Sequence, residues 1–225
     1  MIVGLDEGVG RGLLLCGGGT PRYSEGVILE IVTYGHPVLR EKGKRVGAIS
    51  SEVRQLAANM LETMYHANGV GLAAQQVGQA IQLTVIDVTG VNDRPSQLFI
   101  DGVETDLAGQ MPMILLNPVV SNQQGSQVGP EGCLSIPDIT ANIRRADRIT
   151  VTATGLDGQP VVFECAGLLS RAAQHEIDHL NGILFIDRMD TATKAGLAGQ
   201  LKRMQQETLS LLKRAGKSIR SMMRA

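Results

Sequence analysis

The sequence predicts an α+β fold built on antiparallel strands, and three observations lead to that prediction. Two segments carry apolar residues at helical spacing, and the strand signals between them do not alternate with further helices. Parallel strands need long crossover connections, so strands that follow one another directly favour an antiparallel sheet. Asp157-Gly158, a dipeptide typical of hairpin turns, separates two of these strands.

The first helix is expected from Ser51 to about Ala67. Ser50 or Ser51 can cap its N-terminus, and Glu52 in the first turn suits the positive end of the helix dipole. Apolar residues recur at helical spacing through the segment, namely Val53, Leu56, Met60 and Met64. Asn68-Gly69 is expected to end the helix.

Four segments read as strands, and a second helix follows them. The strands are expected over residues 81–88, 113–120, 148–154 and 160–165, where β-branched and apolar residues dominate. The second helix is expected over residues 168–180, where the pattern is that of a buried helix closed by Asn181-Gly182.

Composition bounds the class of protein. The 225 residues (24.0 kDa) are 43% hydrophobic and 19% charged, which is ordinary for a globular chain. With 3% aromatic residues and no Trp, the core must be aliphatic. A net charge of −1 gives no argument for DNA binding, and no apolar run approaches the 18 residues of a membrane span. Three scattered cysteines, with no secretory leader, favour a reducing compartment, so we expect a cytoplasmic protein.

The chain is expected to have three parts. Residues 1–26 are Gly-rich without lasting periodicity and read as a loose extension, residues 27–190 as the main domain, and residues 191–225 as a basic amphipathic helix. The last part carries eight basic side chains and one acidic one, a charge of +7 against −8 for the remainder. A helix of this kind can pack on the body or bind an anionic surface; membrane-surface binding is the alternative that we do not expect.

His175-Glu176-Ile177-Asp178-His179 is an HExxH motif on the second expected helix. Residues four apart lie on the same side of a helix, so His175 and His179 can share one metal ion. Glu176 projects beside them, where a carboxylate can handle a proton of water.

A catalytic metal needs a third ligand. An HExxHxxGxxH protease would place a third His where Phe185 stands, so that class is excluded. Glu207 is the candidate third ligand of an endopeptidase, although it lies in the basic tail. Cys133, held between turn-forming Gly and Pro residues, is the better candidate, because a thiolate and two imidazoles leave one tetrahedral position for water.

Three motifs together resemble the peptide deformylase family. They are Gly69 to Gln76 (GVGLAAQQ), Glu131 to Ser135 (EGCLS) and Gln174 to His179 (QHEIDH), in the family's order and approximate spacing; Gly35 to Arg40 also looks like its N-terminal segment. The resemblance covers residues 27–190. It implies antiparallel strands around a central helix carrying HExxH, and hydrolysis of the formyl group from the N-formylmethionine of new polypeptides, with release of formate.

The resemblance also implies roles for individual residues. Cys133, His175 and His179 would hold the metal, and Glu176 would take a proton from water and pass it to the leaving amine. The Gln76 side-chain amide and the Leu134 backbone N–H would stabilise the oxyanion. Candidates for contact with the substrate and its methionine side chain are Gly69, Val70, Gly71, Gly129, Glu131, Leu168 and Ala172. Arg171 stands on the same helix where an apolar neighbour of this pocket is expected.

The resemblance implies one Fe²⁺ ion as the cofactor. Zn²⁺, Ni²⁺ or Co²⁺ can replace it, because a Cys/His/His ligand set accommodates all four ions. The expected partners are N-formylmethionyl nascent peptides and, through the C-terminal helix, the ribosome. The alternatives are an HExxH endopeptidase that uses Glu207 and a metal-stabilised module without turnover.

Overall fold

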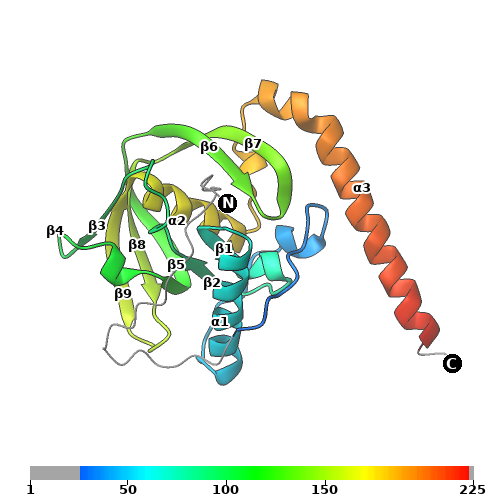
Figure 1. Ribbon diagram of the computed structural model, residues 1–225, viewed down its shortest axis with the longest axis horizontal. Coiled ribbons are helices and arrows are strands. Elements are labelled where there is room, and N and C mark those ends of the chain that lie inside the picture. The colour runs from blue at the N-terminus through cyan, green and yellow to red at the C-terminus, as the bar shows by residue number, and fades with distance from the viewer. Residues whose placement is uncertain (1–25, 223–225) are drawn as a thin grey trace.

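The computed structural model describes residues 26–222 of the chain, so the expected extension at residues 1–26 lies almost wholly outside the described residues. Within this range the chain forms one seven-stranded sheet, one two-stranded sheet and three α-helices (Figure 1). Every ladder between the strands is antiparallel. The predicted α+β class with antiparallel strands is therefore confirmed.

The larger sheet has the strand order β1-β2-β5-β8-β9-β3-β4. Its strands are β1 (Gly71–Ala73), β2 (Leu83–Ile86), β3 (Ser96–Ile100), β4 (Val103–Glu104), β5 (Met113–Gln124), β8 (Arg148–Thr154) and β9 (Pro160–Ala166). The hairpin expected at Asp157-Gly158 joins β8 to β9, and Gly158 has the positive φ of 83° that such turns require.

The smaller sheet is the hairpin of β6 (Gln127–Cys133) and β7 (Ile136–Arg145), which the sequence analysis missed. Its register pairs Glu131 with Ala141 and shifts between Gly132 and Cys133, where the chain turns through Leu134. The hairpin thereby places Cys133 at the end of strand β6.

Helix α1 (Ser51–His66) begins and ends as expected. The Ser50 hydroxyl accepts a hydrogen bond from Val53 N–H, and Asn68 takes a positive φ of 53° just past the last turn. The apolar face of the helix packs on β1 and β2. The shared core comprises Met60, Met64, Leu72, Leu83 and Val85, all completely buried.

Helix α2 (Gly167–Leu180) lies in the middle of the molecule, between the large sheet and the β6–β7 hairpin (Figure 1). One face joins a core with the sheet through Leu168, Leu169, Ala172, Ala173 and Ile177. Gly167 opens the helix with a φ of 66°, and a Cβ there would lie 2.2 Å from the carbonyl oxygen of Pro95. The entry into the helix therefore depends on glycine.

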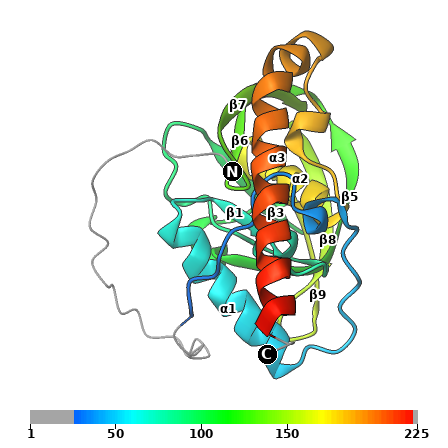
Figure 2. The same ribbon diagram turned by 90° about the vertical axis from the view of Figure 1, so that its right-hand side faces the viewer.

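Helix α3 (Thr191–Met222) runs along the outside of the body (Figure 2). Its first half packs through Leu201 on the core beneath β7, and Thr208 Oγ1 lies 2.8 Å from Thr33 Oγ1. Leu211, farther along, is 63% exposed. In the described part of the chain, no helix combines the length and the apolar character needed to cross a bilayer.

Candidate metal centre

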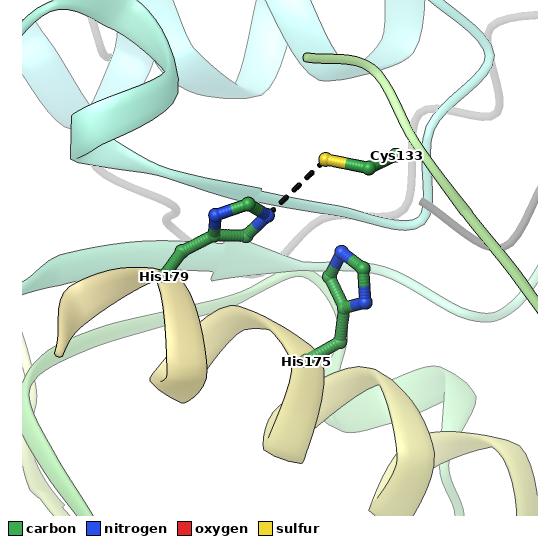
Figure 3. Close-up of side chains that lie close together, drawn as sticks. All are labelled: Cys133, His175 and His179. Carbon is green, nitrogen blue, oxygen red and sulfur yellow. Dashed lines mark hydrogen bonds between the residues drawn. The ribbon is translucent and has the colours of Figure 1, made fainter. Parts of the chain in front are cut away.

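Three buried side chains from two elements meet at one point. Helix α2 presents His175 and His179 on one face, and the end of β6 presents Cys133 opposite them (Figure 3). Cys133 Sγ lies 3.2 Å from His179 Nε2, and one ligand atom from each of the three residues lies within 4.8 Å of the other two. The site joins Cys133 at the end of a strand to a histidine 46 residues later in the sequence, His179.

The residues fit a metal ion. A tetrahedral ion with bonds of about 2.0–2.3 Å keeps its ligand atoms roughly 3.3–3.8 Å apart. The separation of 3.2 Å between Cys133 Sγ and His179 Nε2 is close to this range. The donor set is one sulfur and two imidazole nitrogens, which suits zinc and the later first-row divalent ions. Among the described residues, Cys133, His175 and His179 are the His, Cys, Asp or Glu side chains that converge in this way.

Burial keeps all three ligand side chains uncharged in the absence of a cation. It lowers the pKa of His175 to about 4 and that of His179 well below its ordinary value, and it raises the pKa of the Cys133 thiol. Neutral imidazole is the form that binds a metal, whereas the thiol must lose its proton. Binding of the ion therefore releases a proton from Cys133.

Glu131 lies behind His175. Its carboxylate oxygen Oε2 is 2.9 Å from His175 Nδ1, which leaves Nε2 as the ring nitrogen directed at the centre. The Glu131 side chain is completely buried, and Arg145 and Arg171 also donate hydrogen bonds to it. Although burial opposes ionisation, the bonds from His175 and Arg145 hold the pKa of Glu131 well below its usual range. The structure thus gives Glu131, expected at the substrate pocket, the position of a residue that orients a ligand.

Arg171, which stands where an apolar neighbour of the pocket was expected, is buried. Its side chain is 4% exposed and turns toward β6 and β7, where it donates to Glu131 Oε1 and to the carbonyl oxygens of Gly129 and Ile143. The two remaining substrate candidates on α2, Leu168 and Ala172, pack with Val70 in one buried apolar cluster.

Glu176 projects from α2 beside the two histidines and is 1% exposed. Burial raises the pKa of its carboxyl to about 7, with smaller contributions from nearby Glu131 and Asp178. Its Oε2 atom is buried and has no hydrogen-bond partner among the residues that the structure describes. A carboxylate oxygen with such surroundings is suited to accept a proton.

Gly71, expected to leave its backbone open to substrate, has a second reason to be glycine. A Cβ at this position would lie 2.4 Å from Glu176 Oε1. Strand β1 therefore approaches α2 closely only because residue 71 has no side chain, and the contact fixes where the Glu176 carboxylate lies. A Cβ at Gly69 would in turn meet the Leu134 side chain at 3.3 Å.

Gln76 is fully buried, and its amide is held in a defined orientation. Its Oε1 accepts a hydrogen bond from Ala73 N–H at 2.9 Å, so its Nε2 points the other way, 3.4 Å from Cys133 Sγ and 3.4 Å from Ser135 Oγ. The donor end of the amide thus faces the centre. Leu134 directly follows Cys133 in the turn after β6.

The structure brings the three expected ligands together at one centre, and Glu176, Gln76 and Leu134 lie next to them. Glu207, the alternative third ligand, lies elsewhere. Glu207 is exposed on α3, whereas all three ligand candidates are buried. Sequence reasoning missed the charged residues behind the site, Arg145 and Asp178. The signal for Asp178 was its place in the HExxH segment, since it shares a buried helix with two metal ligands.

Comparison with known proteins agrees with this geometry. The model of the polypeptide deformylase family matches residues 28–195 of the chain. A peptide deformylase of Methylacidiphilum infernorum is 41% identical over 179 residues, which cover 80% of this chain and 94% of that protein. One of Opitutus terrae is 43% identical over 188 residues, covering 82% and 97%.

Solved structures give the same result. The crystal structure of peptide deformylase from Thermus thermophilus has a TM-score of 0.68 at 35% identity and covers 80% of this chain and 99% of that one. The enzyme from Thermotoga maritima has a TM-score of 0.62 at 36% identity, covering 72% and 98%. On sequence, fold and the metal centre together, the chain belongs to the polypeptide deformylase family.

Proposed function

We propose that the chain removes the N-formyl group from new polypeptides by hydrolysis at one metal ion held by Cys133, His175 and His179. The observation that carries the proposal is the convergence of these three buried ligands beside Glu176 and the Gln76 amide. The reaction adds water to the formyl carbon and breaks its bond to nitrogen, so that formate and a free amine leave. When bound, the ion supplies Lewis-acid chemistry: it makes water more acidic and polarises a carbonyl group.

Glu176 moves the proton in this proposal. Its Oε2 takes a proton from the attacking water and delivers it to the departing amine nitrogen, which is a poor leaving group as an anion. The carboxylate is suited to both halves of this task because its buried Oε2 has no competing hydrogen-bond partner among the described residues. The contact with Gly71 keeps the carboxylate in place.

Gln76 and Leu134 stabilise the negative charge that develops on the formyl oxygen. The Gln76 Nε2–H₂ group is already aimed at the centre by the bond from Ala73 N–H, so little reorganisation is needed when the charge appears. The Leu134 backbone N–H is the second donor. Each such donor typically lowers the barrier by about 2.7–4 kcal/mol.

The formylmethionine side chain is received by the apolar cluster next to the ligands. Val70, Leu168 and Ala172 supply its walls, and the Gly129 backbone lies along β6 near Arg171. Gly69 and Gly71 keep the chain before and within β1 free of side chains, which suits a peptide lying against it. Among related structures, that of an Acinetobacter baumannii deformylase contains bound Met-Ala-Ser.

Fe²⁺ is the proposed physiological ion. The Cys/His/His donors accept Fe²⁺, and they accept Zn²⁺, Ni²⁺ and Co²⁺ as well, so the ion found in a purified sample reflects supply as much as preference. A site with a ferrous ion and a thiolate is expected to lose activity in air, whereas a nickel-loaded sample is expected to keep it.

The enzyme is proposed to act in the cytoplasm, where residues 27–190 form the catalytic domain and residues 191–225 the basic helix. Lys213 and Arg214 are exposed on the part of α3 beyond its contact with the body, which leaves them available to ribosomal RNA. Attraction between a basic helix and RNA depends strongly on salt. Docking of α3 on the ribosome would place the enzyme near emerging chains.

Formate release from formyl-Met-Ala-Ser tests the proposed reaction. The protein is purified without oxygen, loaded with Fe²⁺ and compared with a sample from which a chelator has removed the metal. We expect formate and free Met-Ala-Ser only with metal. The same samples are also incubated with unformylated peptides. Cleavage of internal peptide bonds in these peptides, without formate release from formyl-Met-Ala-Ser, would instead identify an endopeptidase.

A further inference from the structure

A line of charged side chains connects the surface of the molecule to the metal centre. It begins at Arg188, just before α3, and ends at His175. The side chains between them, in order, are Asp178, Arg145 and Glu131. The exposed fraction of the side chains falls along the line from 42% at Arg188 to 10% at Asp178 and to 2% or less in the interior.

At each of the two carboxylates in this line, one oxygen atom is shared by two neighbouring side chains of the line. Asp178 Oδ2 accepts hydrogen bonds from Arg188 Nε and from Arg145 Nη1, both at 2.5 Å. Glu131 Oε2 in turn lies 2.9 Å from Arg145 Nη2 and 2.9 Å from His175 Nδ1. Because one oxygen atom accepts from two side chains, a shift of the outer side chain moves the oxygen. The hydrogen bond between that oxygen and the inner side chain then changes as well.

Two members of the line, Asp178 and His175, are also connected through the backbone of α2. Asp178 and His175 belong to the same helix and are three residues apart, so they lie on neighbouring turns. Arg145 and Glu131 belong to the β6–β7 hairpin, the element that also carries Cys133. The ion pairs therefore brace the helix that carries two ligands against the hairpin that carries the third.

The outer end of the line borders water. Arg145, Asp178 and Arg188 line a cavity of about 460 Å³ together with the exposed residues Gln123, Ser126 and Arg144. At this end a side chain can be replaced without leaving a hole in the core, because water takes its place. At the inner end the same change would strand a buried charge.

We propose that Arg188 is a positioning residue for the metal ligand His175. It acts through Asp178, Arg145 and Glu131 and contacts neither the metal nor the substrate. Its two bonds to Asp178, at 2.5 and 2.6 Å, hold that carboxylate against Arg145. Arg145 is then kept in its forked contact with Glu131, and the Glu131 oxygen keeps the His175 ring turned to the ion. The inference rests on the proposed ligand set, but it concerns metal retention and does not depend on formate release.

The test uses Arg188→Ala with Arg40→Ala as its matched control. Arg40 makes an equivalent forked ion pair with Asp187, the residue that directly precedes Arg188 in the chain. The Arg40 side chain is 43% exposed, and the Arg188 side chain is 42% exposed. None of the hydrogen bonds described for Arg40 reaches Asp178, Arg145, Glu131 or His175. Full-length proteins are loaded with Co²⁺, and two quantities are recorded: the visible spectrum of the cobalt and the rate of metal loss to a chelator.

We expect Arg188→Ala to lose cobalt about 3- to 10-fold faster than wild type and to alter the cobalt spectrum, since partners behind a ligand typically change metal affinity by about 10- to 100-fold when lost directly. Arg40→Ala should match wild type in both readouts. Arg188→Lys, which keeps a charge but not the fork, should restore part of the retention. Equal cobalt loss and identical spectra in Arg188→Ala and Arg40→Ala would overturn the proposal, whether or not the protein releases formate.

Discussion

At the scale of single residues, Glu176 shows a conflict between stability and function. An ordinary Glu ionises near a pKa of 4.5, but burial raises the pKa of Glu176 to about 7 in the folded, metal-free chain. The folded chain therefore binds this proton more tightly than the unfolded chain does. A raised pKa suits a group that transfers protons, but it lowers the free energy of unfolding at neutral pH.

This cost predicts how stability depends on pH in the metal-free protein. Below pH 4.5 both states hold the proton and the residue costs nothing; between pH 4.5 and about 7 only the folded chain holds it, so the free energy of unfolding falls as the pH rises. Above that range the loss is complete, at about 3 kcal/mol. Glu176→Gln should remove this dependence. Urea unfolding at pH 4.5 and pH 8 checks it, and an equal pH effect in both proteins would contradict it.

The same variant tests the role of the carboxylate in the reaction. Glu176→Gln should bind the ion with unchanged stoichiometry and release formate about 10²- to 10⁴-fold more slowly, because the amide cannot accept the proton. Metal content and formate release are measured on one preparation. Near-normal turnover with the ion bound would assign the proton transfer to another group.

Gln76 offers a test that separates donor from acceptor. Gln76→Glu keeps an oxygen that can accept from Ala73 N–H and replaces the Nε2–H₂ donor with a second oxygen. We expect kcat to fall by about 10²- to 10³-fold with a smaller change in KM, because the interaction is made in the transition state. A change confined to KM would mean that the amide binds the substrate and does not stabilise the oxyanion.

At the scale of elements, the close approach of β1 to α2 sets the geometry of the centre. Gly71→Ala puts a methyl group 2.4 Å from the Glu176 carboxylate, so that carboxylate must move. We expect a loss of formate release of about 10²-fold or more, since a displacement of about 1 Å can have this effect, while the metal is retained. Gly47→Ala, at a glycine that likewise lacks a positive φ but has open space around it, controls for the loss of a glycine alone; equal activities of the two variants would contradict the account.

The elements also show what the sequence could predict. Helices α1 and α2 carry local signals, namely the Ser50 cap and apolar residues at helical spacing, and both were predicted to within two residues at each end. Strands β8 and β9 were found because β-branched residues flank a hairpin turn. The β6–β7 hairpin was missed because Gly129, Pro130 and Gly132 hide the strand pattern.

The proposed metal ligands could be predicted from the sequence, whereas the roles of the buried charged residues next to them could not. The HExxH spacing and the EGCLS motif single out Cys133, His175 and His179 without reference to structure. Glu131 and Arg145 act through pairings that exist only after the hairpin has folded on α2. Spacing along the chain carries no record of such contacts, so Glu131 was assigned to the substrate pocket.

At the scale of the whole molecule, charge divides the chain into an acidic body and a basic helix. The distal part of α3, with the exposed Lys213 and Arg214, extends away from the body (Figure 1), and the exposed Leu211 adds apolar surface there. The packing of Leu201 and Thr208 fixes the helix to the body, so that the charges are presented in a defined direction. The arrangement favours a partner that is large and anionic.

This arrangement predicts the behaviour of a charge-reversed helix. Lys213→Glu with Arg214→Glu lowers the helix charge by four without touching a buried residue. We expect weaker co-sedimentation with ribosomes, a smaller dependence of binding on salt and unchanged formate release from a tripeptide. Lys44→Glu with Arg45→Glu, an exposed pair on the body, is the control; equal ribosome binding by all three proteins would exclude docking through this helix.

The most direct measurement titrates the metal-free protein with Co²⁺ and follows formate release from formyl-Met-Ala-Ser in the same cuvette. The account predicts that formate release rises linearly and stops rising at one ion per chain, together with an absorption band from cobalt bound to thiolate. In Cys133→Ala both the band and the activity should be missing. Formate release that is independent of added metal, or that persists in Cys133→Ala, would contradict a reaction at an ion held by Cys133, His175 and His179.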